Sequence, residues 1–259
     1  MSPVALLAGQ VTLVTVGVVV AWVVAGRRLP APWSAIGWGA LTFPLSQVAR
    51  FALVMPVTFL LTQVMGPNLG VVNTILLVVT SGLFEETARW IVLRHWAKRV
   101  RSWEGGVAFG LGHGGIEAIL LFGIAALNGI VLLLTADTVR ASVRGAAPDQ
   151  LPAVDAQISA LQALTVGSAA AGVYERILAI VVHVGLTLIV LRGVRTGAWQ
   201  WWLTAVILHC AINGIVVAAA QLGGTLAAES LLTVLALGLL WAALRGPVSR
   251  RTLTGEQRG

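Results

Sequence analysis

A small group of ionisable side chains interrupts stretches of this chain that are otherwise apolar. The segment Phe84–Arg89 places two adjacent carboxylates, Glu85 and Glu86, one helical turn before the guanidinium of Arg89. In a helix Arg89 stands at i+3 from Glu86 and at i+4 from Glu85, so its side chain can pair with either carboxylate. Two carboxylates beside a cation can hold different protonation states, one ionised and one able to carry a proton. The segment therefore predicts acid–base chemistry.

Further polar pairs recur at the spacing of one helical turn. His113 and Glu117 are four residues apart, His209 and Asn213 repeat that spacing, and His183 stands in another apolar stretch. Imidazoles can bind zinc or position a water molecule, and an amide can help to stabilise an oxyanion. The predicted catalytic residues are Glu85, Glu86, Arg89, His113, Glu117, His209 and Asn213, and the candidate metal ligands are His113, His183 and His209. This set can activate water for attack on a carbonyl.

No serine or cysteine stands in the position of a covalent nucleophile beside a histidine–acid pair. Ser81 comes one turn before Glu85, and Cys210 points about 100° away from His209 on a helix. Cys210 is the single cysteine, which excludes an intramolecular disulfide and a cysteine-based zinc site. Activated water is therefore the expected nucleophile.

The composition predicts that a lipid bilayer surrounds the elements that carry these residues. Of the 259 residues 58% are apolar and 10% are charged, and the mean hydropathy is +0.90. A soluble domain of this length needs more charge to cover its surface. The net charge of +7 could suggest nucleic acid, but the basic residues stand at the ends of apolar runs, as in membrane proteins. We expect the bilayer as a partner and no nucleic acid.

The apolar runs predict an all-α fold, a polytopic membrane helix bundle. A spanning helix needs about 20 mostly apolar residues. The predicted spans are 4–25, 36–64, 70–97, 105–134, 171–193, 199–220 and 225–244, which makes about seven transmembrane helices. Residues 151–164 show helical apolar spacing and are expected on the membrane surface. We expect residues 1–259 to form a single transmembrane domain.

The basic residues also predict an orientation. With the N-terminus outside and the C-terminus inside, twelve arginines and lysines fall at inner ends, whereas only Arg140 and Arg144 fall at outer ends. Glu85, His113 and the two later histidines then lie roughly 13–17 Å below the inner boundary. Four helices are thus predicted to deliver their polar groups to one layer, and the glycines around His113 allow close helix approach beside it.

The ordered set of motifs resembles the YhfC family of intramembrane metalloproteases, within the type II CAAX protease and bacteriocin-processing group. The resemblance rests on Glu85-Glu86-x-x-Arg89, His113 with Glu117, His183 and His209-x-x-x-Asn213, and it covers about residues 35–220. The spacing from the glutamate pair to Arg89 is one residue shorter than is usual in the wider group, and it suits the YhfC branch.

This resemblance implies an intramembrane endopeptidase in the cell membrane that cleaves a membrane protein or a lipidated peptide. Glu85 would be the general base that activates water, with the help of His113. Glu86 and Arg89 would support it, and His209 with Asn213 would stabilise the oxyanion or hold a metal. Zinc is the candidate cofactor, and glutamate-activated water without a metal stays open as the alternative.

Other interpretations of the same residues remain open. Ionisable groups inside spans also build proton relays, so a proton-coupled transporter is one alternative, although no pair of related halves is visible in the sequence. A non-catalytic membrane scaffold of the same fold is another, with Glu86 and Arg89 as a structural ion pair. His183 can be a packing residue, Glu117 can serve only to orient His113, and Arg50 can reach the interface or pair internally.

Overall fold

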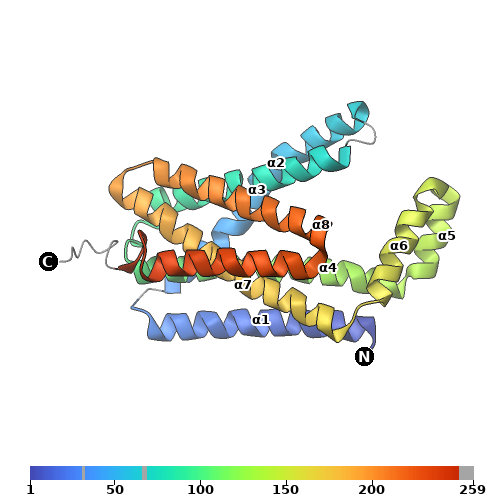
Figure 1. Ribbon diagram of the computed structural model, residues 1–259, viewed down its shortest axis with the longest axis horizontal. Helices are drawn as coiled ribbons and strands as arrows, with labels where there is room; N and C mark the ends of the chain where they lie inside the picture. The colour runs from blue at the N-terminus through green and yellow to red at the C-terminus, as the bar shows by residue number, and fades with distance from the viewer. Residues whose placement is uncertain (31–32, 66–68, 251–259) are drawn as a thin grey trace. The chain divides into compact units, whose positions relative to one another are not determined.

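The computed structural model of the protein describes residues 1–30, 33–65 and 69–250, and in these ranges it contains helices and no strand (Figure 1). The elements are α1 (Pro3–Arg28), α2 (Trp33–Val64), α3 (Leu69–Ile91), the π-helix η2 (Val92–Trp96), α4 (Trp103–Leu134), α5 (Ala136–Ala146), the short 3₁₀ turn η3 (Pro148–Gln150), α6 (Leu151–Gln162), α7 (Val166–Thr196) and α8 (Gln200–Leu244). The predicted all-α class is confirmed.

Within the described ranges, six helices are long and apolar enough to cross a membrane, namely α1, α2, α3 continued by η2, α4, α7 and α8. Helix α8 has 45 residues, which at about 1.5 Å per residue is twice the hydrocarbon thickness of roughly 30 Å. Gly224 interrupts it with a φ of 72°, and Figure 1 shows the chain turning back at this point. The two parts of α8 correspond to the predicted spans 199–220 and 225–244. The fold is a multi-pass membrane helix bundle, and the predicted N-outside, C-inside orientation stays a prediction.

The helices group into two compact units, of which the first comprises Met1–Val19 and Ala118–Ile177. The side-chain amide of Gln10 on α1 donates to the carbonyl of Ala169 on α7 at 2.9 Å. Arg140 on α5 pairs with Asp155 on α6 at 2.7 Å. Helix α6 confirms the helix predicted from the apolar spacing of 151–164, whereas α5 was not predicted. The predicted single domain over 1–259 stays a prediction.

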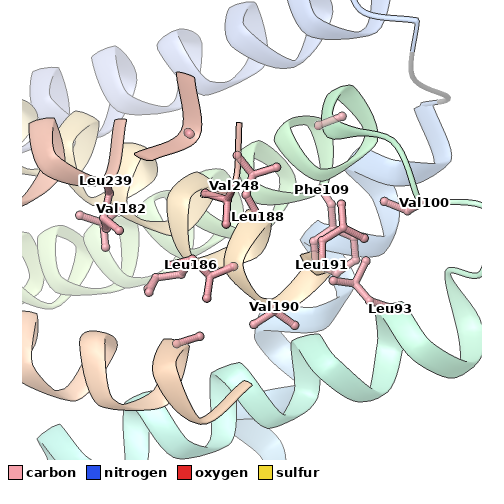
Figure 2. Packing of buried hydrophobic residues seen from close by; sticks show 14 of the residues in the cluster. Leu93, Val100, Phe109, Val182, Leu186, Leu188, Val190, Leu191, Leu239 and Val248 are labelled. Carbon is pink, nitrogen blue, oxygen red and sulfur yellow. The ribbon is translucent and has the colours of Figure 1, made fainter. Parts of the chain in front are cut away.

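The second unit comprises the described residues of Val20–Glu117 and Leu178–Gly259. Its core is a cluster of buried aliphatic side chains and one phenylalanine (Figure 2). Leu93 comes from η2, Phe109 from α4 and Leu186 and Leu191 from α7, and none of the four has exposed surface. Burial of these side chains holds together the helices that carry the candidate site.

Glycines let α4 touch its neighbours through the backbone in this unit. A Cβ added to Gly39 on α2 would overlap the carbonyl of Phe109, and one added to Gly112 on α4 would overlap the carbonyl of Ile36. Such close approach is the usual role of small residues between membrane helices. Helices α2 and α4 are therefore in backbone contact one residue away from His113.

The opposite face of α4 meets α7 in the same way. A Cβ on Gly110 would lie 2.6 Å from the Cα of Val184, and one on Gly114 would lie 3.0 Å from the Cα of Ile180 and 3.1 Å from the Cβ of His183. The predicted close approach beside His113 is thus present at these two glycines and at Gly112.

Helices α3 and α8 also approach closely. A Cβ on Gly82 would lie 2.5 Å from the Sγ of Cys210 and 3.0 Å from its backbone nitrogen. Glu85 follows Gly82 by three residues, and His209 precedes Cys210 by one. This contact therefore brings the glutamate pair of α3 beside the histidine of α8.

Candidate active site

The predicted site residues of α3, α4, α7 and α8 come together inside the second unit. Glu86, Arg89 and His113 have no exposed surface, and Glu85, His183 and His209 are each 4% exposed. Ionisable groups inside apolar helices are costly, so they are retained where partners or function compensate for that cost. Their mutual contacts therefore decide what the cluster can do.

Glu85 joins α2, α3 and α4 through its two carboxylate oxygens. Oε2 lies 3.2 Å from Nε2 of His113, and Oε1 accepts a hydrogen bond of 3.2 Å from the side-chain amide of Gln47. Since both oxygens have partners from different helices, the carboxylate is held in one orientation. The predicted pairing of Glu85 with His113 has the geometry of a general base beside an imidazole.

Arg89 forms its ion pair with Glu86 and not with Glu85. One terminal nitrogen of Arg89 donates to both Oε1 and Oε2 of Glu86, and Oε1 also lies 2.8 Å from Nδ1 of His209. A carboxylate bound by a guanidinium is ionised and accepts only, so Nδ1 of His209 carries the proton of this hydrogen bond. The neutral form of His209 then presents Nε2 as its free acceptor. This arrangement, with a carboxylate behind the imidazole, is the usual one for a histidine that binds a metal.

His183 lies between Arg89 and Glu117. The second terminal nitrogen of Arg89 lies 3.1 Å from Nδ1 of His183, and Nε2 lies 2.5 Å from Oε2 of Glu117 without the alignment of a hydrogen bond. A guanidinium can only donate, so Nδ1 accepts from Arg89, and Nε2 is the ring nitrogen that faces Glu117. Glu117 thus faces His183 on α7, and not His113 one turn earlier on its own helix, because Gly114 brings α7 against this face of α4.

The three imidazoles form a row across the unit. The ring centroids of His113 and His183 are 5.1 Å apart, and those of His183 and His209 are 5.3 Å apart. Phe43 on α2 meets His113 edge-on at 5.6 Å. The row runs from α4 through α7 to α8.

Asn213, predicted as an oxyanion donor, engages a neighbour on α3. Its amide nitrogen donates to Oγ of Ser81 at 2.8 Å. Ser81 is one turn before Glu85, so this bond ties α8 to α3 beside the cluster. The role of Asn213 toward a substrate stays a prediction.

Four side chains of this cluster, of which Glu117 is only partly buried, are placed so that they could hold a metal ion together. Glu85, His113, Glu117 and His183 each offer one ligand atom, and these atoms all lie within 4.8 Å of one another. Two imidazole nitrogens and two carboxylate oxygens form a donor set that zinc accepts. Ligand atoms roughly 2.0–2.1 Å from a tetrahedral zinc are about 3.4 Å apart, so the set needs only small side-chain movements.

Unsatisfied acceptors support this fit. In the described part of the chain, Nδ1 of His113 and Oε2 of Glu117 are buried and have no hydrogen-bond partner. With neutral imidazoles, the three glutamates, Arg89 and the neighbouring Arg50 carry a formal net charge of −1, which a bound cation would offset. The set shares His113 and His183 with the predicted metal ligands. It adds two carboxylates and does not include His209, whose ligation stays a prediction.

Gln47 and Arg50 on α2 belong to the same network and were not predicted as site residues. Arg50 donates to the side-chain oxygen of Gln47 at 3.1 Å, to Thr80 at 3.1 Å and to the carbonyl of Leu77 at 2.8 Å. Gln47 in turn donates to Glu85. The sequence signal that could have found them is a pair of polar residues at i and i+3 within an apolar span.

Comparisons with known proteins bear on the same region. Residues 11–236 match the family described as YhfC intramembrane metalloprotease. The chain is also similar to the uncharacterized membrane protein YhfC of Bacillus subtilis (strain 168), with 34% identity over 136 residues. This match covers 51% of the chain and 52% of that protein, so it spans about half the length of the relative. No solved structure matches the chain. The family match covers most of the chain and all residues of the buried cluster, and the chain therefore belongs to the YhfC intramembrane metalloprotease family.

Proposed function

We propose that this chain is an intramembrane endopeptidase that hydrolyses a peptide bond of a membrane protein or a lipidated peptide with water activated at Glu85. The observation that carries the proposal is the buried pair of Glu85 and His113, 3.2 Å apart, with Glu117 and His183 within 4.8 Å of both. A carboxylate beside imidazoles, enclosed by apolar helices, is suited to take a proton from water away from bulk solvent.

Glu85 acts as the general base. Its carboxylate takes a proton from the attacking water and then delivers it to the leaving amine, so the proton count balances over the cycle. His113 holds the base through Nε2, and Gln47 holds the second oxygen. Gln47 and, behind it, Arg50 are positioning residues that keep the carboxylate in one orientation.

Glu86 and Arg89 hold the imidazoles of His209 and His183 in place. Glu86 orients the ring of His209 through Nδ1, which leaves Nε2 of His209 for the substrate or a metal. Arg89 neutralises Glu86 and at the same time contacts Nδ1 of His183. Asn213 completes the oxyanion side of the proposed site.

His113, Glu117 and His183 are the residues that would hold a zinc ion, with the carboxylate of Glu85 beside them as the base. Bound zinc supplies Lewis acidity, which polarises a carbonyl and makes water a stronger acid. The residues of the chain then position the carbonyl and move the proton, with Glu85 as its acceptor.

The test compares purified full-length wild type with Glu85→Gln in detergent. Both are incubated with a library of transmembrane and lipidated peptides, and bound metal is measured in parallel. Glu175→Gln is a matched control, because Glu175 lies outside the cluster and pairs with the adjacent Arg176. Cleavage by wild type and by Glu175→Gln, but not by a folded Glu85→Gln, supports the proposal. Cleavage by Glu85→Gln at the wild-type rate would exclude Glu85 as the base, and no cleavage by wild type would count against an endopeptidase.

A further inference from the structure

A pocket lies where the helix of the glutamate pair ends. It lies between the first turns of α2 and the turn that follows η2, and its volume is about 310 Å³. Ser34 and Trp38 line it from α2, and Trp96, Lys98 and Arg99 line it from the turn, together with Ala97 and Val100. None of these residues belongs to the buried cluster of the candidate site.

The pocket is lined by apolar as well as polar groups. The rings of Trp38 and Trp96 are 6.3 Å apart between centroids, and Ala97 and Val100 are each only 2% exposed. Two tryptophans and two buried aliphatic residues therefore make up the apolar part of the lining, whereas Lys98 and Arg99 are exposed.

The turn that carries the two cations is held by its own hydrogen bonds. The N–H of Ala97 donates to the carbonyl of Val92 at 2.7 Å, and the N–H of Val100 donates to the carbonyl of Ala97 at 2.9 Å. Arg101 also donates to the carbonyls of Ala97 and Val100. These hydrogen bonds hold the backbone of the turn on both sides of Lys98 and Arg99.

The charge of the pocket is positive and uncompensated. No carboxylate lines it, and none of the ion pairs in the described part of the chain includes Lys98 or Arg99. The ligand that suits the pocket is thus an anion that also has an apolar part.

The place of the pocket indicates the source of that anion. It lies at the first turns of α2 and at the end of η2, which continues α3. Both of these helices are long enough to span a membrane, so we expect the pocket at the level where the hydrocarbon ends. At this level tryptophans pack at the membrane–water interface, and basic pockets between helices bind anionic headgroups. We propose that the pocket of Ser34, Trp38, Trp96, Lys98 and Arg99 binds the phosphate headgroup of an anionic phospholipid.

The experiment measures lipid retention by native mass spectrometry of the full-length protein in detergent, titrated with phosphatidylglycerol or with phosphatidylcholine. The test variant is Lys98→Gln/Arg99→Gln. The control is Arg27→Gln/Arg28→Gln, which removes the same charge at the end of α1, outside the pocket. Each cation near an anionic surface contributes about fivefold in affinity, so the test variant should bind phosphatidylglycerol about 25-fold more weakly. The control should bind it like wild type.

A second variant adds charge and keeps both cations. Ser34→Glu places a carboxylate at the exposed edge of the pocket and should also weaken phosphatidylglycerol binding. A third arm adds inorganic phosphate at millimolar concentration, which should not displace the lipid.

Equal losses in the two double variants would overturn the proposal, because they would show a general attraction to surface charge. Equal retention of the two lipids by wild type would overturn it as well. Displacement by inorganic phosphate would overturn the assignment to a lipid. These readouts need no peptidase activity, so they stand apart from the proposed function.

Discussion

In the part of the chain that the structure describes, Arg89 is the arginine or lysine that touches Glu86, and replacing it by methionine removes that cation. The guanidinium donates to both oxygens of Glu86 and contacts His183, and neither Glu86 nor Arg89 has exposed side-chain surface. After the substitution Glu86 keeps one partner, Nδ1 of His209 at 2.8 Å. Removing one member of a buried ion pair costs about 3–5 kcal/mol because the other charge is left uncompensated. The ratio of folded to unfolded protein should therefore fall by roughly 10²–10⁴.

The double variant Glu86→Gln/Arg89→Met separates this effect from lost packing. It removes both charges, and replacing a whole buried pair is often close to neutral, so we expect it within about 1–2 kcal/mol of wild type. The measurement is reversible unfolding of the purified protein in mixed micelles, followed by far-ultraviolet circular dichroism. Arg28→Met removes an exposed arginine outside the cluster and should change the free energy of unfolding by less than about 0.5 kcal/mol.

Two outcomes would refute this reasoning. If Arg89→Met costs less than about 1 kcal/mol, the pair is not a desolvated charge pair in solution. If the double variant loses as much stability as Arg89→Met alone, the loss arises from packing and not from the charge left on Glu86.

Three further substitutions test the packing, the metal and the positioning of the base. Gly39→Ala would push a methyl group into the carbonyl of Phe109 and should cost about 1–3 kcal/mol in thermal unfolding, whereas Gly37→Ala meets open space and should cost almost nothing. Equal effects of the two would contradict the backbone contact of α2 and α4. Glu117→Ala should weaken zinc at least about tenfold in competition with a chelator, and an unchanged affinity would remove Glu117 from the metal site. Gln47→Leu should lower kcat roughly 10–100-fold with little change in KM, and a loss confined to KM would argue against a positioning role.

The sequence predicted the helices well because membrane spans are set by the length of apolar runs. The sequence also predicted two spans, 199–220 and 225–244, on either side of Gly224. A single helix from Gln200 to Leu244 would be far too long for a bilayer. Helix α5 was not predicted, because its polar composition gives no hydropathy signal.

The pairing of the site residues could be predicted only in part. Spacing alone allowed Arg89 to face Glu85 or Glu86, and the structure places it on Glu86. Spacing suggested that Glu117 orients His113, yet it faces His183. Both outcomes depend on how each helix is rotated about its axis, which follows from packing against other helices and not from the sequence of one helix.

If the proposed function holds, the glycine contacts of α4 limit the routes by which a peptide could reach Glu85. An endopeptidase in a bilayer needs an entrance between helices. Helix α4 is in backbone contact with α2 at Gly39 and Gly112, and with α7 at Gly110. An opening between either pair would therefore require whole helices to separate.

Helices α2 and α3 are instead bridged beside the site by side chains. Gln47 reaches Glu85 and Arg50 reaches Thr80, and farther along Thr58 lies 3.2 Å from Asn73. Side chains change rotamer far faster than packed helices part. On the proposed function, Gln47 and Arg50 are therefore the side chains whose rotamers would have to change for a peptide to enter between α2 and α3.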